Sequence, residues 1–171
     1  MHVIDYVEQV TAGTLNEAKS TYDALHERVH KLVTLIVGGA GGVGVYALGK
    51  VGAIGAIIQV LPLSALACWW LLIAGVLLLR GATSLELKAG STSSSLTQTF
   101  NRRWSTVEGE NLESQALDLV RWDQLASVDL QIIDFCRGAT LRSKSLDNAY
   151  KALVFSPLVA VFFLLLAYRL K

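Results

Sequence analysis

The chain has 171 residues, of which 53% are hydrophobic and only 17% charged, and its formal net charge is +1. Average soluble chains carry about 25% charged residues. The composition therefore excludes disordered, collagen-like and disulfide-scaffold proteins. A net charge this close to zero provides no strong basic field, so we expect no nucleic-acid partner.

The charged residues are unevenly distributed. The 48 residues from Leu32 to Leu79 contain one charge, that of Lys50, and the 17 residues from Ala152 to Tyr168 contain none. Apolar runs of this length are typical of transmembrane helices. No segment shows the alternation of a strand. We therefore predict an all-α integral membrane protein with three transmembrane helices and a helical cytosolic body, and the lipid bilayer as its first partner.

The first predicted element is a polar helix in the N-terminal segment, with a capping box formed by Thr14 and Glu17 at its start. Its apolar residues follow an alternating spacing of three and four, which predicts one stripe along the helix. The stripe consists of Leu15, Ala18, Tyr22, Leu25 and Val29. Two interpretations are open: the stripe packs on the polar C-terminal helix of the same chain, or on a second copy in a homo-oligomer.

The sequence His-Glu-Arg-Val-His, which begins at His26, matches the H-E-x-x-H pattern of zinc proteases. On a helix, His26 and His30 would share a face and hold zinc, while Glu27 activated a bound water. However, charged Arg28 and Lys31 occupy positions that pack into the core of such proteases, and the only other histidine lies at the N-terminus. We favour a solvated turn with an ion pair between Glu27 and Lys31, and expect no metal or other cofactor.

The first transmembrane helix is expected at Leu32–Gly49, a length of roughly 27 Å. It is rich in small residues at the spacing that lets transmembrane helices pack closely. The candidate packing or pore-lining positions are Gly38, Ala40, Gly42, Gly44 and Gly49. Two uses are possible: tight packing of helices within or between subunits, or a path lined by bare backbone that conducts ions.

The same segment also matches G-x-G-x-x-G at Gly39, Gly41 and Gly44, which resembles the nucleotide-binding turn of medium-chain dehydrogenases and quinone reductases. The resemblance covers about 25 residues and would imply a bound dinucleotide. No acidic residue follows at the distance expected for a ribose contact, and another apolar run comes next. We therefore prefer the membrane interpretation of these glycines.

The second apolar run, Val51–Leu79, would be roughly 43 Å long as a straight helix, which exceeds a hydrocarbon core of about 30 Å. We expect Pro62 to kink or break it, a break leaving 51–61 as a re-entrant or interfacial piece. Trp69 and Trp70 then fall inside the membrane, which is tolerable only if they face protein.

The remaining segments complete the predicted organisation. A linker is expected at 89–95, followed by a polar helical region that Gly138 ends or interrupts, and by a third transmembrane helix at 152–168. The division is a cytosolic helix (1–31), a transmembrane hairpin (32–80), a linker with a cytosolic helical region (81–151) and a C-terminal transmembrane helix (152–171).

Lysine and arginine counts predict the orientation. One side of the membrane would hold twelve of these residues and the other side three. Basic residues concentrate in the cytoplasm, so we expect a multi-pass protein of a prokaryotic inner membrane with a cytoplasmic N-terminus.

These features lead to a functional hypothesis that is not enzymatic: a homo-oligomeric channel or pore-forming effector of the toxin, holin or anti-phage type. Its cytosolic helices would gate it on binding a cytosolic protein or a small-molecule activator. One alternative is a non-conducting membrane anchor, accessory or immunity subunit that docks a partner protein. Another is a zinc membrane protease that uses His26, Glu27 and His30.

Overall fold

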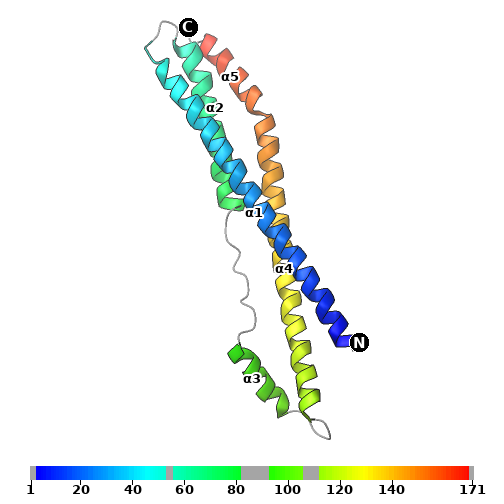
Figure 1. Ribbon diagram of the computed structural model, residues 1–171. Helices are drawn as coiled ribbons and strands as arrows, with labels where there is room; N and C mark the ends of the chain where they lie inside the picture. Colours follow the sequence, from blue (N-terminus) through cyan, green and yellow to red (C-terminus); the bar gives the residue numbers. More distant parts are fainter. Residues whose placement is uncertain (1–2, 53–55, 82–92, 106–111, 170–171) are drawn as a thin grey trace. The chain divides into compact units, whose positions relative to one another are not determined.

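The computed structural model describes residues 3–52, 56–81, 93–105 and 112–169, and all regular structure in these ranges is helical (Figure 1). The helices are α1 (Val3–Gly49), α2 (Ala56–Gly81), α3 (Ser93–Trp104), α4 (Leu112–Val154) and α5 (Ser156–Arg169). Three helical stretches are long and apolar enough to cross a membrane: Val3–Gly49, Ile57–Gly81 and Glu113–Arg169. The all-helical fold and the three apolar helices agree with the sequence prediction.

The predicted start of the first helix at Thr14 is wrong. Helix α1 runs without interruption for 47 residues from Val3, through Gly13 and Thr14, into the apolar segment. The Thr14 hydroxyl donates a hydrogen bond to the Val10 carbonyl at 3.0 Å, one turn back, instead of capping a helix N-terminus. A hydroxyl bonded in this way belongs to a helix interior.

The predicted break at Pro62 is also wrong. Pro62 lies inside α2, whose 26 residues continue through it. The long apolar run is divided earlier, in a turn at residues 50–52, where Gly52 has a φ of 95°. Only glycine adopts this left-handed conformation at no steric cost, so the turn forms here.

The C-terminal half of the chain differs from the prediction in a similar way. Gly138 is buried within an uninterrupted α4, and the helix break falls instead at Phe155, two residues before Pro157. The predicted linker at 89–95 lies largely outside the described residues, and α3 begins at Ser93.

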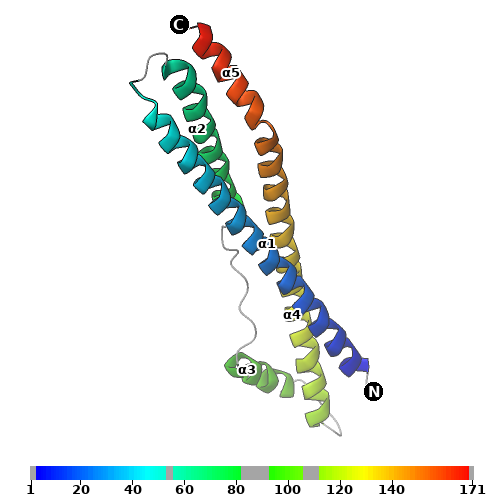
Figure 2. The same ribbon diagram turned by 45° about the horizontal axis from the view of Figure 1, so that its top comes forward.

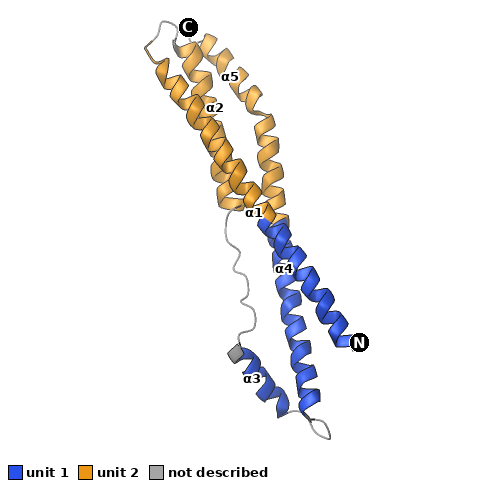
Figure 3. Ribbon diagram, in the orientation of Figure 1, with its two compact units in different colours: residues 1–23, 85–139 blue, residues 24–84, 140–171 orange. Residues whose placement is uncertain are grey.

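The chain forms two compact units, shown in Figure 3. Unit 1 consists of residues 1–23 and 85–139, and unit 2 of residues 24–84 and 140–171. Each unit therefore combines segments that are far apart in the sequence.

Unit 2 is built on the apolar part of α1, on α2, on the last turns of α4 and on α5. Figures 1 and 2 both show α2 alongside the second half of α1, and α2 also packs along α5. Aliphatic residues of α1, α2 and α4 form the core: Val29, Val33, Ile36, Ile73, Ala74, Leu77, Leu146 and Ala149.

Large apolar side chains also cover the outside of unit 2. The exposed fraction is 72% for Leu35, 71% for Val45, 64% for Leu72 and 63% for Leu165. Soluble monomers rarely expose so much contiguous apolar surface. The outer surface of unit 2 is thus suited to contact with lipid or with other apolar helices.

Candidate functional site

A pair of tryptophans on α2 binds the break between α4 and α5. The indole N–H of Trp69 donates a hydrogen bond to the Ala152 carbonyl at 3.2 Å. The indole N–H of Trp70 donates to the Ser156 hydroxyl at 2.9 Å. Both indoles are half-buried, so these residues face protein, as their position inside an apolar segment requires.

Pro157 disturbs the helix next to this carbonyl. Proline lacks an N–H, and its ring clashes with the carbonyl four residues earlier, here that of Leu153, so the regular α-helical bonding stops next to Ala152. The Phe155 amide instead donates to the Ala152 carbonyl at 3.2 Å, which closes a tighter turn. In hydrocarbon, a main-chain carbonyl with weakened helical bonding is costly unless protein supplies a donor. Trp69 supplies one.

An apolar groove of about 540 Å³ lies in unit 2 along the same surface. Its lining includes Trp69 and three phenylalanines, Phe155, Phe162 and Phe163. A groove with almost no polar atoms suits an apolar occupant such as a lipid acyl chain or a side chain of another helix.

Helices α1 and α2 meet at Gly39. A Cβ atom at this position would lie 2.8 Å from Cζ3 of Trp70, closer than side chains tolerate. Only glycine leaves room for the indole, which in turn reaches Ser156. Gly39 was not among the predicted packing positions, although it belongs to the same glycine-rich run.

The predicted small-residue positions have two different environments. Ala40 is only 2% exposed and packs inside unit 2. In contrast, a Cβ atom at Gly38, Gly42, Gly44 or Gly49 would meet no atom within 4 Å, and the same holds for Gly41. We call these five positions (Gly38, Gly41, Gly42, Gly44 and Gly49) the glycine face of α1. Among the described residues, no atom would contact a side chain added on this face.

The stripe on the N-terminal part of α1 faces inward. In unit 1, Tyr22 is 8% exposed and contacts Phe135 of α4 edge-to-face, with ring centroids 5.4 Å apart. In unit 2, Val29 is fully buried in the core. Ala18 is buried as well, while Leu15 and Leu25 are half-buried. One chain therefore covers much of the stripe by itself, and packing of the stripe on a second copy stays a prediction.

The two histidines of the H-E-x-x-H sequence do come together. Their Nε2 atoms are 3.1 Å apart, and the rings are nearly perpendicular. The Glu27 carboxylate does not join the two histidines. It forms an exposed ion pair with Lys31 at 2.7 Å. Hydrogen bonding to Lys31 holds the pKa of Glu27 below its usual value. Within the described ranges, no three His, Cys, Asp or Glu side chains form a group that would hold a metal ion.

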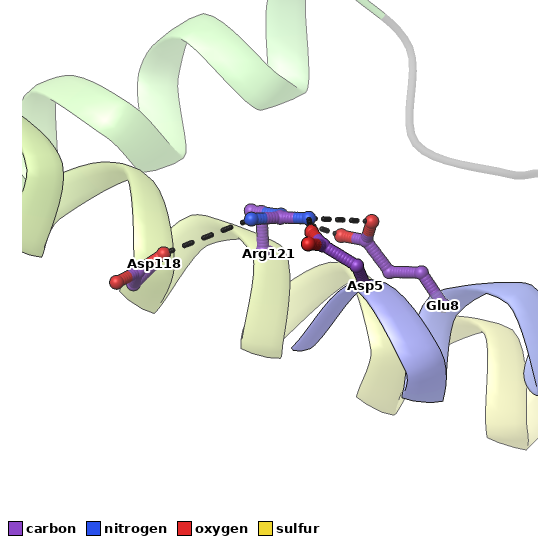
Figure 4. A network of polar contacts seen from close by, with 4 residues as sticks. All are labelled: Asp5, Glu8, Asp118 and Arg121. Carbon is purple, nitrogen blue, oxygen red and sulfur yellow. Dashed lines mark hydrogen bonds and ion pairs between the residues drawn. The ribbon is translucent and has the colours of Figure 1, made fainter. Parts of the chain in front are cut away.

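Unit 1 contains a charge cluster that the sequence analysis missed (Figure 4). Arg121 of α4 donates to both carboxylate oxygens of Glu8 on α1, each at 2.7 Å, and to Asp5 at 2.6 Å. Asp118 lies 3.9 Å away on the same helix as Arg121. The hydrogen bond from Arg121 lowers the pKa of Glu8, and the bonds to Glu8 and then Asp5 raise the pKa of Arg121. The cluster joins α1 to α4.

A second paired arginine joins α3 to α4 in the same unit. Arg103 forms a bidentate pair with Asp123, with bonds of 2.8 and 2.9 Å. The pair lowers the pKa of Asp123, chiefly through the hydrogen bond from Arg103.

In unit 2, a buried arginine caps the end of α2. Arg142 is 3% exposed, and its Nε donates to the Gly81 carbonyl at 3.0 Å. The last carbonyls of a helix lack helical partners, so a cation at this end compensates both the hydrogen bond and the helix dipole. A sequence signal existed, since Arg142 lies on the apolar face of its helix, three residues after Ala139 and four before Leu146.

Comparisons with known proteins add no functional information: no family model, no curated protein and no solved structure matches the chain.

Proposed function

We propose that the chain is a homo-oligomeric channel or pore-forming effector of a prokaryotic inner membrane, with a cytoplasmic N-terminus and gating by the helices of unit 1. The observation that carries this proposal is the glycine face of α1. Five glycines in the apolar part of one helix lie against open space. A glycine in an isolated helix costs about 1 kcal/mol relative to alanine, so five unused positions call for a compensating contact.

Close packing between copies would supply that contact. Gly38 and Gly42 have the G-x-x-x-G spacing, which lets two transmembrane backbones approach until dispersion and weak hydrogen bonds hold them. Van der Waals packing is the main attraction available there, because lipid tails are as apolar as the side chains. Where the glycines do not touch a neighbour, their bare backbone offers polar groups to a water-filled path.

The experiment compares two leucine substitutions in apolar helices. Gly42→Leu places a large side chain on the glycine face, whereas Gly75→Leu on α2 is a matched control, because a Cβ at Gly75 also meets nothing within 4 Å. We expect wild-type and Gly75→Leu chains to be oligomers by native mass spectrometry from detergent. We expect Gly42→Leu to be a monomer and to lose ion flux in liposomes. An unchanged oligomer for Gly42→Leu contradicts the proposed interface.

A second candidate function, a non-conducting anchor that docks a partner protein, is favoured by α4. Within unit 1, α4 carries apolar residues on the side opposite its buried face. They are Leu119, Trp122, Ala126, Leu130 and Ile133, and all are exposed. Their spacing of three, four, four and three residues is that of a helix-docking stripe.

Ion flux separates the two candidates. Wild-type oligomers that leave liposomes impermeable to potassium and protons would favour the anchor. In that case Ile133→Glu should abolish recruitment of a partner in cells, while Asp129→Glu, a nearby exposed position, should leave it intact. Flux from the wild type with Gly42→Leu inactive would favour the channel.

A further inference from the structure

Two imidazoles of α1 form a preorganised pair in unit 2. His26 and His30 lie one helical turn apart and therefore on one face of the helix. Their Nε2 atoms are separated by 3.1 Å, the ring centroids by 4.4 Å, and the ring planes are inclined by 82°. Both Nε2 atoms thus approach the same point in space.

This separation matches the requirement for binding one metal ion. Two imidazole nitrogens that each lie about 2.0–2.1 Å from a single ion at an angle near 100° are about 3 Å apart. The helix places both side chains on one face before any ion arrives, so less conformational entropy is lost on binding than for two unconnected ligands. The 3.1 Å separation of the two Nε2 atoms is also that of a hydrogen bond between the rings. An entering ion would replace this hydrogen bond.

The surroundings permit an ion to enter. His30 is exposed and His26 half-buried, so solvent reaches the pair. The nearest cation in sequence, Lys31, is neutralised by its 2.7 Å ion pair with Glu27. Because the described ranges hold no group of three potential ligands, water would occupy the remaining coordination positions.

We propose that His26 and His30 form a two-imidazole site for a divalent transition-metal ion such as Zn²⁺, Ni²⁺ or Cu²⁺. Imidazole nitrogens favour these ions, whereas Mg²⁺ and Ca²⁺ require oxygen ligands. The site differs from a zinc-protease centre, because it has two protein ligands and the Glu27 carboxylate is bound to Lys31. It lies two residues before the apolar segment that begins at Leu32, so an ion there would stiffen the last polar turn of α1.

The test uses full-length protein in detergent, carrying no polyhistidine tag, with Cys68→Ser and Cys136→Ser as background because both cysteines are exposed. Titration calorimetry with Zn²⁺ should show one site per chain. His26→Ala and His30→Ala should each weaken binding on the order of 100-fold, since one ligand of a bidentate pair is lost. His2→Ala is the matched histidine control and should leave binding unchanged.

Electron paramagnetic resonance of bound Cu²⁺ provides a second measurement. We expect hyperfine structure from two imidazole nitrogens in the background protein and from at most one in each of the two single variants. Alanine at these helical positions favours the helix, so the variants should fold, and circular dichroism checks this. No saturable Zn²⁺ binding by the background protein, or unchanged binding when both histidines are replaced, would overturn the proposal.

Discussion

The indole of Trp69 and the main-chain carbonyl of Ala152, 83 positions apart in the sequence, are joined by a 3.2 Å hydrogen bond. The bond lies where Pro157 stops the regular hydrogen bonding of the C-terminal helices. It therefore combines two roles, since it attaches α2 to the end of α4 and supplies a donor to the backbone in an apolar region.

Trp69→Phe removes the indole donor and keeps an aromatic ring. We expect a loss of about 1–2 kcal/mol in the free energy of unfolding, because the Ala152 carbonyl keeps only its bond from Phe155. Thermal unfolding in detergent, followed by circular dichroism, measures the effect. Trp122→Phe is the control, since Trp122 is 47% exposed, and it should change stability by less than about 0.5 kcal/mol. Equal losses in the two variants would contradict the assigned role.

Gly39→Ala should destabilise unit 2 by about 1–3 kcal/mol, because the new methyl group would overlap the Trp70 ring. Gly75→Ala has open space and should instead gain up to about 1 kcal/mol from helix preference. Combining Gly39→Ala with Trp70→Leu tests the contact directly by a double-mutant cycle. Additive effects of the two changes would show that Gly39 and Trp70 are not coupled.

Arg142→Met should lower the free energy of unfolding by about 1.5–3 kcal/mol, the usual range for a hydrogen bond to a charged group. The variant keeps much of the side-chain volume but leaves the Gly81 carbonyl without this donor. Lys144→Met, an exposed position on the same helix, should have little effect. Hydrogen exchange at the C-terminal turn of α2 locates the change, and exchange that stays at the wild-type rate would disprove the cap.

Acidification should weaken unit 1 through Glu8. The hydrogen bond from Arg121 lowers the pKa of Glu8 below its ordinary value of 4.5. A carboxylate whose pKa is lowered by folding stabilises the fold above its unfolded pKa, and this contribution disappears as the pH falls through the folded pKa. The melting temperature should therefore hold at neutral pH and decline below about pH 4.5.

Arg121→Gln isolates the Glu8 contribution from those of other carboxylates. The variant should melt lower than wild type at pH 7, and the difference should shrink as the pH falls below 4.5, the ordinary pKa of the Glu8 carboxyl. Arg137→Gln, an exposed position on α4, serves as the control and should reproduce the wild-type profile. A wild-type pH profile in Arg121→Gln would show that the cluster does not support the fold.

The sequence predicted the helical class and the three apolar helices because composition and apolar run length depend on local residues alone. It failed at the helix boundaries, where the strongest local signals were misleading. Thr14 and Glu17 have the residues of a capping box, but the helix begins at Val3. Pro62 was expected to break a helix, but α2 continues through it. The long apolar run is divided instead at the turn that contains Gly52.

The contacts of the candidate sites were less accessible to sequence reasoning. Arg121 and Glu8 are separated by 113 positions, and Trp70 and Ser156 by 86. Pairings at such distances depend on how helices pack, which periodicity does not encode. The convergence of His26 and His30 was predictable, since residues four apart on a helix share a face. Ala40 is buried, whereas the glycine face is open. This difference was not predictable, because Ala40 and the glycines belong to the same small-residue segment of α1.

In a family of related chains, the two tryptophans of α2 should differ in how their contact positions are conserved. Trp69 bonds to a main-chain carbonyl, so position 152 is free to change residue type without losing the acceptor. Trp70 bonds to a side-chain hydroxyl and also requires glycine at position 39. Positions 39, 70 and 156 should therefore vary together during evolution, whereas position 69 should stay constant beside a freely varying position 152.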